Sequence, residues 1–435
     1  MTGAPPARPE RSERLGGAFH RLLAACGLTN LGDGMLATAL PLIAATLTHD
    51  PLAVSGLLAA RFLPWLLVAP LSGVLLDRVD RLRAMAAANA VAAAAVAVLA
   101  AVVALGRAEL WILYTVLFLV VACETVSDPA ARISAARLVP GRLLDRANGR
   151  LEGMHLVAQD CAAKPVAGML FAVAALLPVA GTALSYALCS LLVASVVLLL
   201  RRRPRPDGDA DAAGTEREPA EGVLRSLREG LAHVFGDRLI LRMMFANAGT
   251  MAGVQMATAV MVLHVRQVLE VPVALYGLFI ATIAVGGIAG AAAASRLVLA
   301  VGRRTVMTAG YAGMGAGLAA MGLTDDARLA AAAWALVGVS MTTSNIAGSV
   351  FFQAVVPEHV RGRVSAVYRT VGWGLAPAGA LAGGLLGRID LGLPYLVGGL
   401  LVLGTVLVFW RTIAECARLC DEAAARLAAA DAAPR

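Results

Sequence analysis

The sequence predicts an all-α integral membrane protein with twelve transmembrane helices in two six-helix pseudo-repeats. The 435 residues are 59% apolar and 15% charged, and the mean hydropathy is +0.76, whereas soluble domains are about 45–50% apolar and about 25% charged. The apolar residues form runs of about 20, the length that crosses the hydrocarbon of a bilayer. Arg-rich breaks separate these runs. Together the observations exclude a water-soluble enzyme, a secreted disulfide scaffold and a disordered chain.

Each apolar run with its connection takes about 30 residues, which predicts six spans on either side of a polar stretch. The expected spans are 16–47, 52–76, 84–105, 109–131, 149–176 and 180–200, then 238–265, 272–297, 304–322, 328–353, 364–386 and 391–411. The expected domains are an N-terminal tail (1–15), an N-terminal bundle (16–200), a linker (201–237), a C-terminal bundle (238–411) and a C-terminal tail (412–435).

Arginine predicts the orientation in the membrane, because cytoplasmic loops carry an excess of Lys and Arg. Loops after even-numbered spans contain Arg78, Arg81 and Arg83; Arg132, Arg137, Arg142, Arg146 and Arg150; Arg296, Arg303 and Arg304; and Arg361, Arg363 and Arg369. The other loops contain Arg107, Arg266, Arg328 and Arg388. We therefore expect a multi-pass protein of the cell membrane with both termini and the linker cytoplasmic. The net charge of +8 then reflects topology and membrane contact, not nucleic-acid binding.

The linker reads RRRPRPDGDADAAGTEREPAEG and continues as VLRSLREGLAHVF. Its Pro, Gly and alternating charges predict a disordered connector, and the apolar spacing of its second part predicts an amphipathic helix on the inner membrane face. The six cysteines show neither CxxC nor zinc spacing, so they are expected to act as small apolar residues. No metal and no cofactor is expected.

An internal repeat appears when the second half is moved back by 217 residues. Asn247 then falls on Asn30, Gly290 on Gly73, and Val356-Pro357 on Val139-Pro140. Parallel six-helix repeats are typical of secondary transporters.

Ionisable residues inside the spans are candidates for function, because a charge at the bilayer centre costs at least about 2.5–3.5 kcal/mol. Asp33 lies roughly 20 Å deep in span 1 at 1.5 Å per residue. Arg61 of span 2 is expected at a similar depth, which predicts an Asp33–Arg61 pair. It would act in proton coupling or be a structural ion pair.

Two acidic residues of span 4, Glu124 and Asp128, lie four apart and share a helix face. Glu124 lies deeper, so we expect it to face the cavity and to bind a proton or cation. His155 of span 5 could relay protons, although a lone His at this depth is more often a packing residue.

Lys164 is the only lysine of the chain and follows Asp160 by four residues, which favours a pair on one face. A lysine, unlike an arginine, can lose its proton when buried. Three interpretations stay open: a structural Asp160–Lys164 pair, a lysine that gates proton or anionic-substrate binding, and a substitution that faces a watery cavity.

The second half lacks these charges. The repeat places Thr250, Met341 and Asn345 opposite Asp33, Glu124 and Asp128, so ion coupling is expected in the N-terminal half. Methionine, aromatic and amide groups suit an amphipathic organic substrate; alternatively, they only pack helices. The candidate substrate-binding residues are Asn30, Asn247, Met251, Gln255, Trp334, Met341, Ser344 and Asn345.

The loop after span 2 resembles a known signature. It reads GVLLDRVDRLR from Gly73 and is similar to G-x-L-x-D-R-x-G-R-x-R of the major facilitator superfamily. The resemblance implies a cytoplasmic latch that holds the outward-open state. Its expected residues are Gly73, which lets spans close up, Asp77, which can cap the next helix, Arg78, Arg81 and their partner Asp128. Asp80 departs from the pattern, and in the second copy Ala294 and Ser295 replace the Asp-Arg pair.

Three further segments, NLGDG, LVPGRLLDRANG and VVPEHVRGRVSA, resemble the branch with macrolide and enterobactin exporters. Exporters of the family often carry G-x-x-x-G-P-x-x-G-G in span 5. Here only Pro165 and Gly168 match, which weakens the inference of export.

The expected function is proton-coupled efflux of a hydrophobic or amphipathic small molecule, such as a drug, antibiotic or natural product, by an antiporter that alternates access. The alternatives are an uptake symporter or facilitator, a transport-inactive sensor or scaffold, and a membrane-embedded enzyme, for which no span shows a catalytic constellation. We expect a monomer whose partners are the lipid bilayer, protons and the substrate.

Overall fold

The computed structural model describes residues 15–201, 231–357 and 374–432, with a few positions between 360 and 368. Within these ranges every regular element is a helix, as expected. The first tail and most of the linker, including most of its predicted amphipathic helix, lie outside the described residues.

Helices of the N-terminal half follow one another with short connections. They are α1 (Gly17–Leu47), α2 (Pro51–Arg61), α3 (Leu63–Leu67), α4 (Ala69–Arg78), α5 (Arg81–Ala104), α6 (Leu110–Leu138), η1 (Gly141–Leu143), α7 (Leu144–His155), η2 (Leu156–Ala163), α8 (Lys164–Val173) and α9 (Leu176–Arg201). η1 is a 3-10 turn and η2 a π-helix.

The described part of the C-terminal half is also helical. They are α11 (Arg238–Ala259), α12 (Met261–Leu263), the π-helix η3 (His264–Val268), α13 (Val273–Val301), α14 (Arg303–Gly322), α15 (Ala327–Gly348), α16 (Phe351–Val355), α18 (Ala376–Gly387) and α19 (Leu393–Ala432). α19 continues as one helix beyond residue 411, where the sequence predicted that the tail begins.

Length and apolarity identify eight candidate spans among the described residues, or ten if each of two bent pairs counts as one. The bent pairs are α2–α3 with α4, at 49°, and α11 with α12–η3, at 43°; they match the second and seventh predicted spans. α14 and the short apolar α18 lie where the remaining two predicted spans fall. Prolines explain the first bend, because Pro64 and Pro70 lack the N–H that continues a helix.

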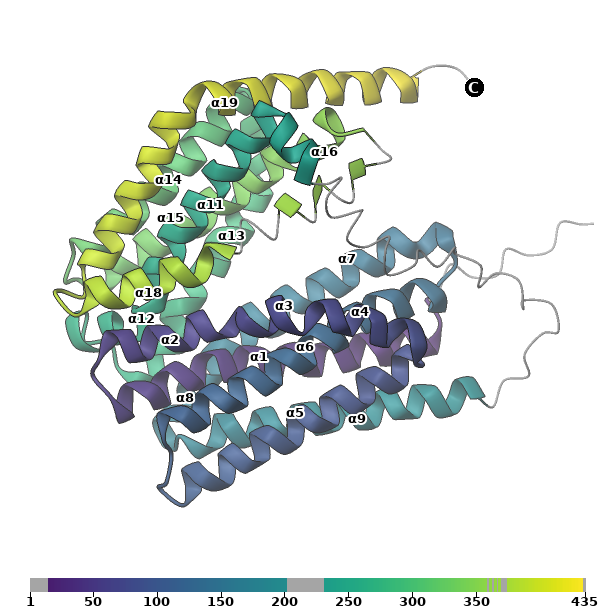
Figure 1. Ribbon diagram of the computed structural model, residues 1–435, viewed down its shortest axis with the longest axis vertical. Coiled ribbons are helices and arrows are strands. Elements are labelled where there is room, and N and C mark those ends of the chain that lie inside the picture. The colour runs from purple at the N-terminus through teal and green to yellow at the C-terminus, as the bar shows by residue number, and fades with distance from the viewer. Residues whose placement is uncertain are drawn as a thin grey trace, which may run out of the picture.

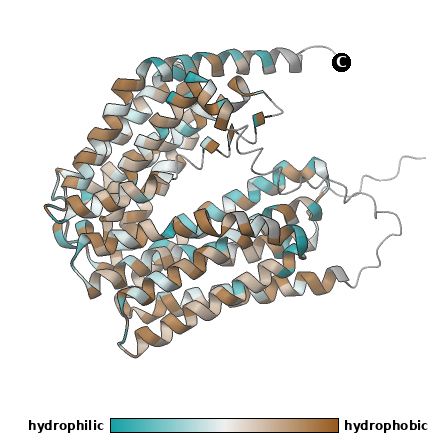
Figure 2. Ribbon diagram, in the orientation of Figure 1, coloured by the Kyte–Doolittle hydropathy of each residue, from teal (hydrophilic) through white to brown (hydrophobic). Residues whose placement is uncertain are grey.

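Large apolar side chains are exposed along the outer faces of the helices. Val98, Leu191 and Leu407 are each more than half exposed, and Figure 2 shows hydrophobic residues along the length of most helices. Surfaces this apolar are rare on soluble monomers. The exposed faces are therefore those of a multi-pass membrane protein.

The two halves share a core at one end only. We call the end that carries the Arg-rich loops after α4, α6 and α13 the basic end. One apolar cluster contains residues of both halves, such as Leu40 and Leu57 with Val260 and Leu263. Towards the basic end each half instead has a cluster of its own. In Figure 1 the end of α9 accordingly lies far from α16 and from the end of α19.

Candidate functional site

A central cavity of about 430 Å³ lies between the two halves. Its wall is mainly apolar and includes Leu40, Leu57, Val262, Tyr276 and Ile280. The ionisable Asp, Glu, Lys and Arg side chains on that wall are Arg61, Asp160 and Lys164. All three belong to the N-terminal half.

Arg61 approaches Glu124, not Asp33. Its guanidinium lies 4.0 Å from the Glu124 carboxylate, whose side chain is 13% exposed. The predicted Asp33–Arg61 pair is therefore wrong. The reason is local. The helix is interrupted ahead of Pro64, so α2 ends at Arg61. From there the Arg61 side chain extends towards Glu124 on α6.

Asp33 contacts α9. It is 7% exposed and accepts a hydrogen bond of 2.6 Å from the hydroxyl of Tyr186. Glycine at position 32 permits this contact, because a Cβ there would lie 3.0 Å from the Tyr186 ring. Tyr186 was not among the residues expected from the sequence; the available signal was a tyrosine in the middle of the sixth predicted span.

The predicted Asp160–Lys164 pair is present, with 2.7 Å between Nζ and Oδ1. Both side chains are mostly buried, at 28% and 20% exposure. The π-helix η2 ends at Ala163, directly before Lys164, and π turns often occur at functional sites. One turn further on, α8 touches α13 closely, because a Cβ on Gly168 would lie 2.8 Å from the backbone of Gly277. The span therefore keeps a backbone-to-backbone contact beside its charges.

Three of the predicted substrate residues line the central cavity: Gln255, Trp334 and Met341. Trp334 is 4% exposed, and its indole N–H has no hydrogen-bond partner among the described residues. A donor on the cavity wall is thus free to meet a ligand.

The other candidates lie elsewhere. Asn30 lines a separate cavity inside the N-terminal half. Ser344 is buried against α14, where a Cβ on Gly310 would lie 2.0 Å from its hydroxyl, and it does not line the central cavity. The remaining three, Asn247, Met251 and Asn345, are partly buried or exposed and do not line the central cavity.

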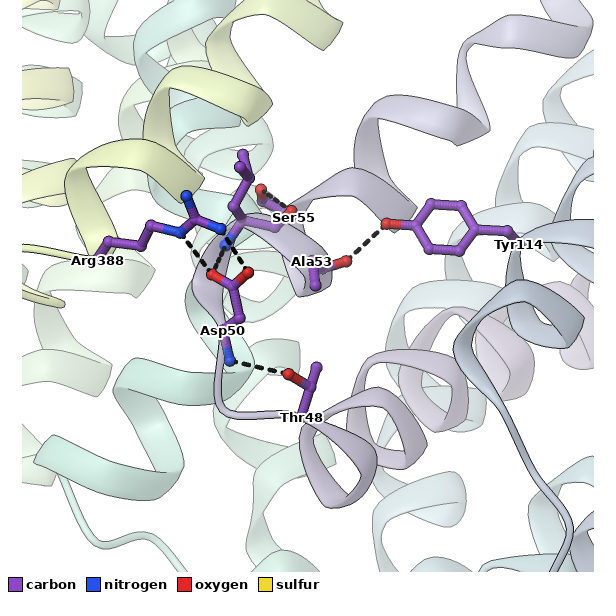
Figure 3. Close-up of polar contacts among 7 residues, drawn as sticks. Thr48, Asp50, Ala53, Ser55, Tyr114 and Arg388 are labelled. Carbon is purple, nitrogen blue, oxygen red and sulfur yellow. Dashed lines mark hydrogen bonds and ion pairs between the residues drawn. The ribbon is translucent and has the colours of Figure 1, made fainter.

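A polar contact closes the end opposite the basic end (Figure 3). Arg388, after α18, donates two hydrogen bonds of 2.7 and 2.6 Å to Asp50, which also accepts from the backbone N–H of Leu52 and so caps α2. The bond from Arg388 lowers the pKa of Asp50 below its usual range, and the same bond raises the pKa of Arg388. Nearby, a Cβ on Gly384 would lie 2.0 Å from the hydroxyl of Ser55. The halves are therefore tightly apposed at this end.

Comparison with known proteins decides the family. The family model of the Major Facilitator Superfamily matches residues 22–373 and 243–419. The chain belongs to this superfamily. It is therefore a transporter and not an enzyme. No curated protein matches the chain significantly.

Solved structures of transporters share the superfamily fold. A bacterial homologue of the iron transporter ferroportin in an inward-facing state is 18% identical, with a TM-score of 0.69 over 91% of this chain and 98% of that one. The nucleoside transporter NupG is 12% identical, with a TM-score of 0.67 over 91% and 99%. A D-xylose–proton symporter is 14% identical, with a TM-score of 0.61 over 90% and 96%. At these identities the likeness shows the fold alone.

Among the described residues, the side chains of the superfamily signature form no ion pair in this conformation. Asp77 and Arg78 are exposed, and among the described residues no ion pair joins Asp77, Arg81 or Asp128 to one another. The Nε of Arg81 is buried without a hydrogen-bond partner there.

Two details of the signature differ from expectation. Asp80, not Asp77, caps α5, accepting from the N–H of Arg83, because α5 begins at Arg81 and the cap is the residue before it. Gly73 has nothing within 4 Å of a Cβ position, so it does not bring spans together here. Its repeat counterpart Gly290 does, since a Cβ there would lie 2.7 Å from the carbonyl oxygen of Val339.

Proposed function

We propose that this superfamily member is a proton-coupled antiporter that exports a hydrophobic or amphipathic small molecule, with the basic end in the cytoplasm. One observation carries the proposal: the Asp, Glu, Lys and Arg side chains that line or back the central cavity all come from the N-terminal half. This separation supports ion coupling in the N-terminal half, whereas residues of both halves line the cavity and could contact the substrate.

The cavity supports an amphipathic substrate. A volume of about 430 Å³ falls within the about 300–1,000 Å³ of small-molecule sites. Trp334, Met341 and Tyr276 provide apolar and polarisable surface, and Gln255 with the unpartnered indole N–H of Trp334 provides hydrogen bonds. The Asp160–Lys164 pair would meet a charged or strongly polar group of the substrate.

Asp33 has the environment of a proton site. It lies within the membrane, has one hydrogen bond from Tyr186, and has no ion-pair partner among the described residues. Charges at membrane depth are costly, so taking up a proton removes the cost. Glu124, held 4.0 Å from Arg61, connects this site with the cavity wall. Proton uptake at Asp33 would thereby alter the charge next to the substrate.

Export is the direction that the resemblance to the macrolide and enterobactin exporter branch favours. An uptake symporter of the same fold is the alternative. The cavity joins the halves where their shared core ends, and the halves separate towards the basic end. The conformation is thus the one in which a cytoplasmic substrate would enter an exporter.

Inverted membrane vesicles test the coupling and the direction. A panel of amphipathic dyes and antibiotics is offered with and without an acid-inside pH gradient. An antiporter accumulates at least one compound inside the vesicles when the gradient is present, whereas a symporter does not.

The coupling residue is tested in the same vesicles with Asp33→Asn, which keeps the shape of the side chain but removes the titrating group. Gradient-driven accumulation should be lost while gradient-independent binding remains. Thr250→Val at the equivalent position of the other half is the matched control and should behave as the parent. If Asp33→Asn accumulates substrate as the parent does, Asp33 is structural and Glu124 becomes the leading candidate.

A further inference from the structure

The C-terminal half carries, on its outer surface, a tryptophan that contacts two arginines. Trp410 lies on α19 and is 47% exposed. The guanidinium of Arg304, at the start of α14, lies over the Trp410 ring at 5.7 Å from its centre, and that of Arg411 lies over the ring at 5.4 Å. Both distances are within the about 6 Å of a cation–π contact. Two helices that pack side by side (Figure 1) thus place two positive charges on one aromatic ring.

Both arginines keep donors for a ligand. Arg304 and Arg411 are exposed, and among the described residues neither forms an ion pair. Glu415, one turn after Arg411, does not pair with it. An aromatic ring offers no lone-pair acceptor to the five N–H groups of a guanidinium. The ring therefore positions the two cations without satisfying their hydrogen bonds.

The neighbouring arginine has a different role. The side chain of Arg303 is 12% exposed, and its Nε lies 2.7 Å from Oδ1 of Asp421. It also donates to the backbone carbonyl of Ala347. Arg303 thereby holds α14, α15 and α19 together. Arg304, the next residue, has no such contact, so packing of the helices does not account for it.

The position of the three side chains suits the surface of a membrane. Arg304 begins the ninth predicted span and Arg411 ends the twelfth, and tryptophan is enriched at membrane–water interfaces. Leu400 and Leu407 share the face of α19 that carries Trp410, by helical spacing, and are 55% and 76% exposed. The opposite face of α19 is buried in the apolar cluster of this half. An exposed apolar strip therefore leads to a cationic group at the level of lipid headgroups.

An anionic phospholipid matches both parts of this surface. Its phosphate oxygens accept the charge-assisted hydrogen bonds that guanidinium groups donate, and its acyl chains cover exposed leucines. A free anion would use the arginines but leave the strip bare. A choline headgroup brings a positive charge next to two arginines that already occupy the aromatic ring, so a headgroup with a net negative charge is favoured.

We propose that Arg304, Trp410 and Arg411 form a binding site for the headgroup of an anionic phospholipid in the leaflet at the basic end. The phosphate is held between guanidinium groups from α14 and α19, and one acyl chain lies along Leu407 and Leu400. None of the three headgroup residues lines the central cavity. The site is thus separate from the one proposed for the substrate.

Fluorescence quenching by brominated lipids tests the site. The purified full chain is reconstituted in phosphatidylcholine vesicles with increasing fractions of brominated phosphatidylglycerol, or of brominated phosphatidylcholine as the neutral probe. The signal of Trp410 is the fluorescence of each protein minus that of the same protein with Trp410→Phe. In the parent, brominated phosphatidylglycerol should quench this signal at a fraction about tenfold or more below that of the neutral probe.

Charge variants locate the preference. Arg304→Gln and Arg411→Gln should each reduce it about fivefold, because one arginine near an anionic lipid surface contributes about that factor. The matched control is Arg418→Gln, which removes an exposed arginine of the same helix that pairs with Glu422; it should keep the parent preference. Quenching by the neutral probe should be the same in all variants, which shows that Trp410 keeps its place in the membrane.

Three results would overturn the site. The first is equal quenching of the parent by the two brominated lipids. The second is an equal loss of preference in Arg418→Gln and Arg304→Gln, which would indicate the general charge of the surface. The third is relief of quenching by inorganic phosphate, which would indicate an anion site that does not need a lipid.

Discussion

The ion pair between Asp50 and Arg388 sets how strongly the protein favours the conformation closed at the end opposite the basic end. The two side chains are 36% and 49% exposed, and exposed pairs contribute about 0.2–1 kcal/mol. Two parallel charge-assisted hydrogen bonds place this pair near the upper limit. Because opening that end breaks the contact, losing the pair should raise the population of the opposite conformation by about fivefold or less.

Arg388→Gln and Asp50→Asn test this value. Asparagine caps a helix as well as aspartate does, so the second variant removes charge without disturbing the start of α2. Spin labels at Ala136 and Ser295, which are exposed on the two halves at the basic end, report the distance between the halves. Both variants should increase the population with the short distance, and the double variant should equal either single one. The control is Arg107→Gln, which changes an exposed arginine at the same end as Arg388. If the distance distribution of Arg388→Gln equals that of Arg107→Gln, the reasoning is refuted.

The pH dependence of the same pair follows from its pKa shift. Because the bond from Arg388 lowers the pKa of Asp50 below 3.8, the pair stabilises closure fully above that ordinary value. The contribution is lost only as the pH falls through the lowered pKa. The distance distribution should therefore stay constant through neutral and mildly acidic pH. A loss of closure at mildly acidic pH would contradict this assignment.

Three further predictions concern packing, the span 5 pair and the latch. Gly277→Ala places a Cβ 1.8 Å from the carbonyl oxygen of Lys164, so the free energy of unfolding in detergent should fall by about 1–3 kcal/mol. Gly404→Ala, whose Cβ would have nothing within 4 Å, should leave the free energy of unfolding unchanged. Equal stabilities of the two variants would argue against the close helix contact. Lys164→Ala should lower transport activity and reduce the stability by about 1.5–3 kcal/mol. Adding Asp160→Ala should restore part of the stability. If both single variants are present in the membrane at the parent level and transport normally, the pair has no role. Arg81→Ala should reduce cysteine labelling from the outer side, because the latch holds the outward-open state; unchanged labelling together with unchanged transport would exclude the latch.

The sequence by itself determined the helical membrane fold and the half that supplies the charged side chains of the central cavity. These properties depend on hydropathy and on residue identity, which do not require knowledge of how helices turn towards one another. The Asp160–Lys164 pair was predictable for a related reason. Residues four apart on one helix are neighbours whatever the tertiary structure.

Contacts between helices needed the tertiary structure. Depth along a span suggested that Asp33 meets Arg61, but depth does not give the rotation of a helix about its axis. In addition, the helix break before Pro64 changes the direction in which the Arg61 side chain points. Tyr186 therefore replaced Arg61 as the partner of Asp33, and Glu124 became the neighbour of Arg61. The Asp50–Arg388 pair joins residues 338 positions apart. Only the packing of the two halves against each other brings such distant side chains together, since no local pattern records which loops meet.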